Sequence, residues 1–545
     1  MAHDKPILVV GGSGVFGSRL AAGLVRDGFG DVIIAGRDLA RAEKTAKPLG
    51  CRAIALDISD KRLTAQLQEL SPWLVIDAAG PFQAYGNYHL AEAAIAVGAH
   101  CFDLSDDGAF TAGISALDER AKAAGVVVRS GVSSVPALSA AAVRALSQDL
   151  SDIALIETMI LPGNRAPRGV SVMKAILAQA GKPMINGDVG WTGARRARVG
   201  TLTRLASPIG APDLQLMRDA FGTRDVRFFA GLELWVMHRG LGALAWAVKR
   251  GLLSDATALA RPLRWAAAPL YYFGSDKGAM RVRVVGTDPD GRLSARQWAL
   301  TAIGGDGPHV PALPARVLTK MLADNRLSPG AEAELHSIVL EETEAHAAPL
   351  RLSFARTETA FIPRFQTVLG DKFDVLPPQI KALHGVIGRA TWTGKADVTR
   401  GVGLAARVVA WAFRFPKAAR DIPVTVQMER TDTSEVWTRS FGAQSFRSEL
   451  TPDGKTPGRM WERFGLFTFA IDLEVDANGL AFPVTKGRFL GFPIPHVILP
   501  KSDTLEAVSE TGAATFSVRL SLPIIGDVVH YQGWLTPEPT PENTV

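Results

Sequence analysis

The chain has very little cysteine: only Cys51 and Cys101 occur among its 545 residues. Two cysteines exclude a disulfide-rich scaffold, and no C-x-x-C pair or Cys/His cluster indicates a metal ion. Both cysteines lie in or beside stretches typical of strands, where a thiol packs as a small hydrophobic side chain. We therefore expect a reducing compartment and no metal site.

Long hydrophobic runs are also missing, because no stretch of 18 or more apolar residues occurs. A membrane-spanning helix is not expected, and the short polar start is not that of a signal peptide. The formal net charge is only +6 and no zinc-finger or RNP-like motif occurs, so we expect no nucleic-acid partner. With 47% hydrophobic and 21% charged residues, the chain is expected to be globular, in the cytoplasm or at its membrane surface.

A glycine cluster follows an apolar run near the start, in Ile7-Leu-Val-Val-Gly-Gly-Ser-Gly-Val-Phe-Gly17. Gly12, Gly14 and Gly17 fit G-x-G-x-x-G, and Gly11 with the latter two fits a looser spacing. Such glycines allow a tight strand-to-helix turn, a close approach to a pyrophosphate and close helix packing. The helix that follows offers its N-terminal N–H groups to the phosphates. The predicted cofactor-binding residues here are Gly12, Ser13, Gly14, Val15, Phe16 and Gly17.

The end of the second predicted strand favours NADP(H) over NAD(H). An NAD-binding fold usually has an acidic residue about 20 positions past the glycines, on the ribose 2′-hydroxyl. Gly36 takes that place here and Arg37 follows it, which suits a 2′-phosphate. Asp38 is a second interpretation, since its carboxylate can still reach a ribose hydroxyl. Asp57, after the third strand, either accepts a bond from the adenine amino group or belongs to a surface turn.

Strands and helical stretches alternate through the first 130 residues, which predicts βαβ units in a doubly wound parallel sheet. Longer strands with helices follow, around the turn signal Asp288-Pro-Asp-Gly291. The last third reads mostly as antiparallel strands, with a hairpin signal at Asn478-Gly479. The predicted domains are a Rossmann domain at 1–135, an α+β substrate or dimerisation domain at 136–345, a β-rich domain at 355–537 and a flexible tail at 538–545. The helix expected at 315–323 is predicted to return to the first domain.

Ordered landmarks carry a family resemblance. They include Val75-Ile-Asp-Ala-Ala-Gly-Pro-Phe82, Gly98-Ala-His-Cys-Phe-Asp-Leu-Ser105 and Gly131-Val-Ser-Ser-Val-Pro136. With the glycine cluster, they make the first 345 residues or so resemble the saccharopine dehydrogenase (reductase)-like family. The resemblance implies a Rossmann domain, NADP(H) use and an inserted domain that often carries dimer contacts. The backbone of Ala79, Gly80 and Pro81, after the fourth predicted strand, is well placed to shape the nicotinamide–ribose pocket.

The region from about 360 to 537 is similar to a domain of unknown function, the DUF4166 type. Its landmarks include Leu376-Pro-Pro-Gln-Ile-Lys-Ala-Leu-His384 and Glu435-Val-Trp-Thr-Arg-Ser-Phe441. This likeness implies no chemistry. His384 is interpreted as a buried structural histidine, with a catalytic base as the alternative.

No tyrosine is followed by lysine four residues later, so a short-chain dehydrogenase mechanism is disfavoured. Hydride transfer asks the protein mainly to orient cofactor and substrate. Ser105 and Ser134 are the candidate catalytic residues, although serine at such positions also caps helices or closes turns. The expected activity is NADP-dependent reduction of a carbonyl, imine or enoyl substrate with lipid-like character. A nucleotide-binding scaffold, a lipid-binding protein and lysine-pathway saccharopine chemistry are the alternatives.

Two stretches raise the question of partners. Arginines cluster between 160 and 210, among them Arg195, Arg196, Arg198 and Arg204, and would form either an anion-attracting patch or an ordinary solvated face. Aromatic and basic residues mix within 232–273, which is typical of a membrane-surface helix or of helices packed in a homodimer. Small-molecule or lipid-like substrate, membrane surface and a second copy are therefore the partners considered.

Overall fold

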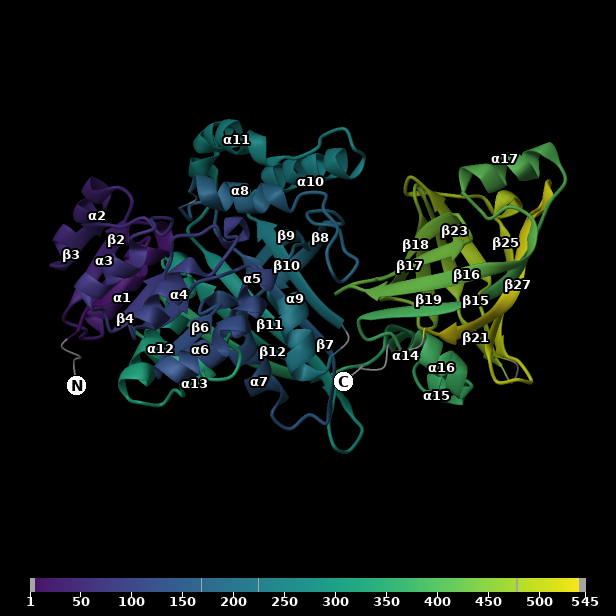
Figure 1. Cartoon of the computed structure of the whole chain (residues 1–545). Helices are drawn as coiled ribbons and strands as arrows, with labels where there is room; N and C mark the ends of the chain where they lie inside the picture. The colour runs from purple at the N-terminus through teal and green to yellow at the C-terminus, as the bar shows by residue number, and fades with distance from the viewer. Residues whose placement is uncertain (1–4, 168, 224, 477–478, 539–545) are drawn as a thin grey trace. The chain divides into compact units, whose positions relative to one another are not determined.

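The computed structural model describes residues 5–167, 169–223, 225–476 and 479–538. It divides into two compact units, Met1–Ala360 and Phe361–Val545 (Figure 1). The first unit contains two seven-stranded sheets and the second a thirteen-stranded sheet, counted over the described residues. The expected hairpin residue Asn478 and the tail residues 539–545 lie outside the described residues.

The first sheet is parallel throughout, in the order β13-β6-β5-β4-β1-β2-β3. Its strands are β1 (Ile7–Val10), β2 (Val32–Gly36), β3 (Arg52–Ala55), β4 (Leu74–Asp77), β5 (His100–Asp103), β6 (Val127–Ser130) and β13 (Gly330–Ala333). The helices between them are α1 (Val15–Arg26), α2 (Leu39–Ala46), α3 (Leu63–Leu70), α4 (His89–Ala96), α5 (Gly108–Gly113) and α6 (Asp118–Ala124). Strands β1, β4 and β6 are fully buried, and β2 is buried except at Gly36, because helices cover both faces. The chain reverses its strand order between β1 and β4, which is where such sheets bind ligands.

Residues far along the sequence complete this sheet. Strand β13 pairs with β6 almost 200 residues after it, and α12 (Leu313–Ala323) packs on α1. The Arg316 guanidinium, buried on α12, donates two hydrogen bonds to the Asp27 carboxylate at the end of α1, at 2.7 and 2.6 Å. The helix expected at 315–323 therefore contacts the first sheet's helices. The edge strand was not predicted, because Gly330-Ala-Glu-Ala333 has no β-branched residue.

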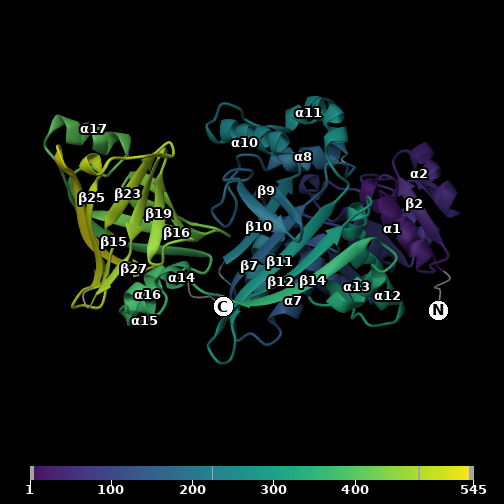
Figure 2. The same cartoon turned by 180° about the vertical axis from the view of Figure 1, so that it is seen from behind.

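The second sheet of this unit is mixed, in the order β14-β12-β11-β7-β10-β9-β8, and curls beside the first (Figure 2). Strands β7 and β10 pair in parallel and the other described neighbours pair antiparallel. The strands are β7 (Asp152–Leu161), β8 (Arg195–Val199), β9 (Leu202–Pro208), β10 (Asp225–Leu232), β11 (Gly278–Thr287), β12 (Leu293–Ala302) and β14 (Leu352–Ala360). The Asp288–Gly291 turn joins β11 to β12, as its sequence predicts. The helices around it are α7 (Ser139–Ser147), α8 (Val170–Ala178), α9 (Asp213–Phe221), α10 (Trp235–Lys249), α11 (Ala260–Ala267) and α13 (Leu340–His346).

One hydrophobic core runs through both sheets of the first unit, from Val9 and Ile34 in the parallel sheet to Val282 and Trp298 in the mixed one. Helices α10 and α11 lie at the edge of this unit together with α8 (Figure 1). Several of their large side chains are exposed, among them Trp235 at 63% and Trp265 at 82%. The partner of this surface, a membrane or a second copy, stays a prediction. No helix among the described residues is long and apolar enough to cross a membrane.

The second unit is a single antiparallel sheet that curves around an interior (Figure 1). Its order is β21-β22-β25-β26-β27-β15-β16-β17-β18-β19-β20-β23-β24. The strands are β15 (Arg389–Arg400), β16 (Ala419–Arg430), β17 (Glu435–Phe441), β18 (Gln444–Pro452), β19 (Arg459–Phe464), β20 (Phe467–Asp472), β21 (Glu474–Asp476), β22 (Gly479–Ala481), β23 (Val484–Phe489), β24 (Phe492–Pro493), β25 (Lys501–Val508), β26 (Ala514–Leu522) and β27 (Gly526–Pro537). Its helices are α14 (Arg364–Leu369), α15 (Lys372–Val375), α16 (Pro378–His384) and α17 (Leu404–Ala412). The predicted fold class, a Rossmann sheet followed by an α+β part and an antiparallel β part, is confirmed.

Candidate functional site

The glycine turn lies at the carboxyl end of β1 and leaves no room for side chains. Gly11 has a positive φ of 72°, and a Cβ there would come within 2.5 Å of the Ala79 Cα. A Cβ on Gly17 would lie 2.4 Å from the Gly11 carbonyl oxygen, and one on Gly12 would lie 2.9 Å from Ile34 Cγ2. The tight turn therefore starts at Gly11, so the looser spacing of Gly11, Gly14 and Gly17 describes the geometry better than G-x-G-x-x-G.

Helix α1 begins immediately after this turn, with Gly14 as its N-cap and no side chain capping it. The first N–H groups of an α-helix have no partner within the helix, and here no cap side chain accepts from them. Ser13 precedes the cap and Val15 and Phe16 form the first turn. The six residues predicted from the glycine cluster therefore surround a helix N-terminus that suits a pyrophosphate, and the arrangement fits a dinucleotide.

Arg37 and Asp38 follow the end of β2. The Arg37 side chain is exposed, and the Asp38 carboxylate is hydrogen-bonded to the backbone of the next helix. Asp38 is the N-cap of α2, and its carboxylate accepts a hydrogen bond from the Arg41 backbone N–H at 3.1 Å. The Arg41 guanidinium turns back toward the glycine turn and donates to the Ser13 carbonyl oxygen at 3.4 Å. The guanidinium groups of Arg37 and Arg41 therefore both lie near the end of β2. Sequence reasoning missed Arg41, although its position one turn into a helix after Gly36-Arg37 was a usable signal.

Asp57 lies in an exposed turn after β3. Its carboxylate accepts hydrogen bonds from the Ser59 backbone N–H at 2.9 Å and the Ser59 hydroxyl at 2.7 Å. These bonds, with a smaller contribution from the charge of Arg37, hold the pKa of Asp57 below its usual value. The geometry is that of a turn aspartate, and a bond to adenine stays a prediction.

The turn after β4 is held by a buried carboxylate. Asp77 is 4% exposed, and its Oδ1 accepts a hydrogen bond from the Ala79 backbone N–H at 2.9 Å. Burial raises the pKa of Asp77 to about 7, and the Asp103 charge adds to this effect. Gly80 follows with a positive φ of 35° and a cis peptide bond to Pro81. The predicted residues Ala79, Gly80 and Pro81 therefore form a turn that lies against the glycine turn, where Ala79 approaches Gly11.

Asp103, next to Asp77 in the sheet register, ties together the ends of β5 and β6. Its Oδ1 accepts hydrogen bonds from the Ser105 N–H, the Ser130 hydroxyl and the Gly131 N–H, each at 2.9 Å. Burial raises the pKa of Asp103 to about 6. Two carboxylates thus fix the backbone around the point where the strand order reverses. Neither was singled out from the sequence.

The two serine candidates differ in access. Ser105 is fully buried, and its hydroxyl accepts from the Thr111 hydroxyl at 3.0 Å and the Asp107 N–H at 3.2 Å. Ser134 is partly exposed and begins the π-helical turn Ser134–Leu138 after β6. Ser105 therefore supports the loop, whereas Ser134 retains a surface that a ligand can reach.

Aromatic rings pack beside the turn after β4. Phe82 lies 5.0 Å from Tyr85 and 5.4 Å from Phe110 between ring centroids, and Tyr88 lies 4.7 Å from Phe110. Burial and the neighbouring Asp77 raise the pKa of the Tyr85 phenol, which therefore stays protonated. These rings give one side of the site an apolar wall.

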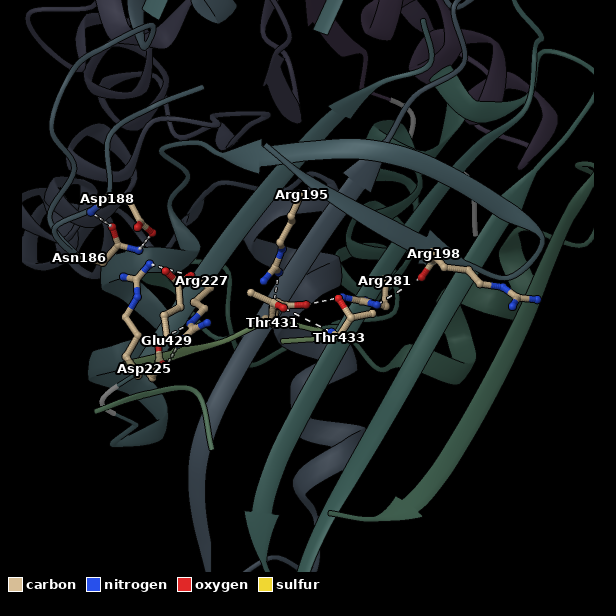
Figure 3. Close-up of polar contacts among 12 residues, drawn as sticks. Asn186, Asp188, Arg195, Arg198, Asp225, Arg227, Arg281, Glu429, Thr431 and Thr433 are labelled. Atoms are coloured by element: carbon tan, nitrogen blue, oxygen red, sulfur yellow. Dashed lines mark hydrogen bonds and ion pairs between the residues drawn. The ribbon is translucent and has the colours of Figure 1, made fainter. Parts of the chain in front are cut away.

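Two arginines of the basic stretch pair with carboxylates of the first unit, one buried and one half-buried. Arg195 binds Glu157 at 2.6 Å and stacks on the Phe229 ring, and Arg281 binds the other oxygen of Glu157. Figure 3 shows Arg195 and Arg281, with Arg281 directed to the Arg198 carbonyl oxygen. Arg204 binds Glu233 at 3.1 Å and donates to two carbonyl oxygens. These two arginines support the mixed sheet, while Arg196 and Arg198 remain exposed.

His384 is fully buried in the second unit, where its Nε2 shares a hydrogen bond with Glu506 Oε2 at 2.5 Å and its ring lies 4.0 Å from Phe365. This is the environment of a structural histidine. Cys101 is buried and Cys51 half-buried, and both are free thiols. In the described part of the chain, no three His, Cys, Asp or Glu residues come together as a metal site would require.

Comparison with protein families matches both ends of the chain. Residues 7–128 match the saccharopine dehydrogenase NADP binding domain, and residues 376–535 match DUF4166, a domain of unknown function. Comparison with the curated proteins found no match.

Solved structures give more distant likenesses. Saccharopine dehydrogenase (L-Glu forming) from Saccharomyces cerevisiae is 16% identical, with a TM-score of 0.48 over 65% of this chain and 100% of that one. A probable dehydrogenase from Thermotoga maritima is 11% identical, with a TM-score of 0.32 over 63% of this chain and 93% of that one. GenD2 from gentamicin A biosynthesis, in complex with NAD, is 16% identical, with a TM-score of 0.32 over 66% of this chain and 97% of that one. The family matches therefore identify two parts of the chain: residues 7–128 are similar to the saccharopine dehydrogenase NADP binding domain, and residues 376–535 are similar to DUF4166.

Proposed function

We propose that the chain is an NADPH-dependent reductase that acts on a carbonyl, imine or enoyl group of a lipid-like substrate. The observation that carries the proposal is the glycine turn at the reversal of strand order, with Arg37 and Arg41 beside it and Asp38 occupied as a helix cap. A guanidinium pair suits a 2′-phosphate, and the Asp38 carboxylate is directed to the N-terminus of α2, where its Oδ1 accepts from the Arg41 N–H. The preference for NADPH over NADH follows from these charges.

Bound NADPH would supply a hydride to the electrophilic carbon, and a proton taken up at the oxygen, the nitrogen or the α-carbon would complete the reduction. The chain's own residues would orient the reactants. The α1 N-terminus at Gly14 would hold the pyrophosphate. The Asp77 and Asp103 carboxylates would keep the turns beneath the nicotinamide in place, because each binds backbone N–H groups there. The aromatic wall at Phe82 would exclude water.

Ser134 is the candidate for a hydrogen bond to the substrate or the carboxamide, since it is partly exposed where Ser105 is not. The matched pair Ser134→Ala and Ser105→Ala separates the two roles. Ser134→Ala should lower kcat on the order of 10²-fold with unchanged NADPH affinity. Ser105→Ala should instead lower the free energy of unfolding by about 1–2 kcal/mol, because it leaves buried hydrogen-bonding groups without a partner.

The test is oxidation of NADPH by the purified chain with a panel of enones, ketones and imines that carry alkyl chains of increasing length. Turnover that strengthens with chain length supports the proposal. Tight NADPH binding without oxidation by any member of the panel would contradict it and favour a nucleotide-binding scaffold. NADP+-dependent oxidation of saccharopine, assayed separately and without turnover of the panel, would favour lysine-pathway chemistry.

A further inference from the structure

The curved sheet of the second unit encloses a cavity of about 510 Å³ that the proposed reduction does not use. Small-molecule sites typically measure roughly 300–1,000 Å³ and are mainly apolar. Its wall is built from inward-facing side chains of β16–β20, β23 and β25–β27 and from α17 and the residues after it. It is rich in aromatic rings, including Phe413, Phe441, Phe446, Phe467 and Phe516. Protein interiors are otherwise close-packed, so a void of this size lined by rings indicates space kept for an apolar ligand.

The polar groups on this wall are few and largely compensate one another. Arg439 donates to the Ser448 hydroxyl at 2.8 Å and lies 3.5 Å from a Glu462 oxygen. Glu506 is bound to His384. The wall therefore carries one guanidinium, paired with the Glu462 carboxylate, and a second carboxylate, that of Glu506, hydrogen-bonded to His384. Such a wall does not favour an anionic head group.

Tyr531 supplies the donor that an uncharged ligand needs. It is 5% exposed, lines the cavity, and stands opposite Val518 in the register of β26 and β27. Its hydroxyl makes no hydrogen bond to another residue in the described parts of the chain. Burial raises the pKa of Tyr531 to about 12, so the hydroxyl keeps its proton. A buried hydroxyl of this kind normally has a partner, and a ligand oxygen would provide it.

The cavity opens at the end of the sheet near α17. Phe489 and Ile498 line it and are also 40% and 51% exposed, which marks the mouth. Strand register places the turns after β19, β23 and β26 at this same end, because Phe464 pairs with Phe467, Phe467 with Phe489, and Leu522 with Gly526. Those turns expose Leu466, Leu490 and Ile524, and the nearby α17 exposes Trp411. A water-insoluble ligand therefore meets apolar side chains along its way in.

We propose that the second unit binds an uncharged single-chain lipid with a hydroxyl or carbonyl group. The alkyl chain lies among the phenylalanine rings, and the oxygen accepts a hydrogen bond from the Tyr531 hydroxyl. This inference rests on the second unit alone, so failure of the reductase proposal leaves it in place.

The experiment uses the full chain and the uncharged fluorescent probe N-phenyl-1-naphthylamine, displaced by hexadecan-1-ol or by hexadecanoate. The expected result is saturable binding of one probe per chain, with the alcohol displacing it at least tenfold better than the carboxylate. Tyr531→Phe should weaken the binding of the alcohol about fivefold, since one neutral hydrogen bond is lost, and should leave the affinity for the probe unchanged. Displacement by hexadecanoate that equals or exceeds displacement by the alcohol would overturn the proposal that the ligand has an uncharged head group.

A variant that fills the cavity, compared with a control on the outer face of the same strand, tests whether the probe binds in the cavity. Val518→Trp places a larger ring in the cavity and should abolish probe binding, whereas Arg519→Trp, on the outer face of the same strand, should not. A folded Val518→Trp that binds like the parent would overturn the proposal. As a second measurement that needs no variant, the parent chain is mixed with hexadecan-1-ol, passed through gel filtration and extracted. An equimolar amount of retained alcohol supports the site, and none retained overturns it.

Discussion

The carboxylate of Asp38 accepts a hydrogen bond from the backbone N–H of Arg41 at 3.1 Å and caps helix α2. The acidic side chain that directly follows Gly36-Arg37 therefore makes a hydrogen bond to the backbone of α2. The same helix turn brings the Arg41 guanidinium to the Ser13 carbonyl oxygen, beside the glycine turn. This capping bond, together with the two guanidinium groups, supports the proposed preference for a 2′-phosphate over a ribose hydroxyl.

Asp38→Ala tests this capping role. It should lower the free energy of unfolding by about 1 kcal/mol, the usual cost of losing an N-cap. The ratio of NADPH to NADH affinity should stay within about twofold of the parent value, because the proposed cofactor contacts are made by Arg37 and Arg41 and not by the Asp38 carboxylate. Asp38→Asn, which keeps a capping oxygen, is the control and should retain most of the stability. A selective loss of NADH affinity in Asp38→Ala would contradict this assignment.

Gly17→Ala should disrupt the nucleotide site, because its Cβ would lie 2.4 Å from the Gly11 carbonyl oxygen. We expect a loss of about 1–3 kcal/mol in the free energy of unfolding and a loss of nucleotide binding of at least tenfold. Gly30→Ala is the matched control, since nothing lies within 4 Å of its Cβ and its φ is not positive. Denaturant unfolding and nucleotide titration of the two variants provide the comparison. Equal behaviour would show that the glycine turn can relax.

Glu157→Gln removes the carboxylate that Arg195 and Arg281 both bind within the mixed sheet. The pKa of Glu157 is held low by these two guanidinium groups despite burial, so its charge contributes stability above its ordinary pKa and loses that contribution as the pH falls below it. The substitution should cost about 3 kcal/mol at neutral pH. Glu119→Gln, whose side chain is 92% exposed, should cost less than about 0.5 kcal/mol. Urea unfolding of both variants measures the difference, and equal midpoints would contradict a structural role for the buried cluster.

The buried carboxyl group of Asp213 should make the free energy of unfolding depend on pH in the direction opposite to that of Glu157. It is fully buried, accepts from the Thr158 hydroxyl at 3.0 Å, and its pKa is raised by burial to about 7 from 3.8. The folded chain therefore holds a proton that the unfolded chain releases, so this contribution is complete below about pH 4 and lost as the pH rises to about 7. Asp213→Asn should stabilise the protein at pH 8 by about 2 kcal/mol and flatten the change between pH 5 and 8. The exposed Asp219→Asn is the control, and an unchanged pH profile in Asp213→Asn would contradict the raised pKa.

The Rossmann sheet could be predicted because its signals are local: apolar runs, glycines and helical periodicity alternate within 130 residues. The edge strand β13 could not, since its four residues become a strand only by pairing with β6. The same holds for the buried carboxylates Asp77 and Asp103, whose roles depend on strand ends that meet in space.

The basic stretch shows the limit of reading charge along the sequence. Only Asp188 opposes the arginines between 160 and 210, yet Arg195 and Arg204 bind Glu157 and Glu233, which lie outside that window. In the second unit, alternation predicted strands such as β26. It could not predict that their inner face surrounds a cavity instead of a filled core.

The most direct test of the central claim is a fluorescence titration of the purified chain with NADPH and with NADH, repeated on Arg37→Ala and on the exposed control Arg62→Ala. The account predicts tight NADPH binding that weakens about 10- to 100-fold in Arg37→Ala, with NADH affinity unchanged, because charge-assisted bonds to a phosphate are lost. Arg62→Ala should bind like the parent. Absence of binding by either nucleotide, or an Arg37→Ala variant that still prefers NADPH as strongly, would contradict it.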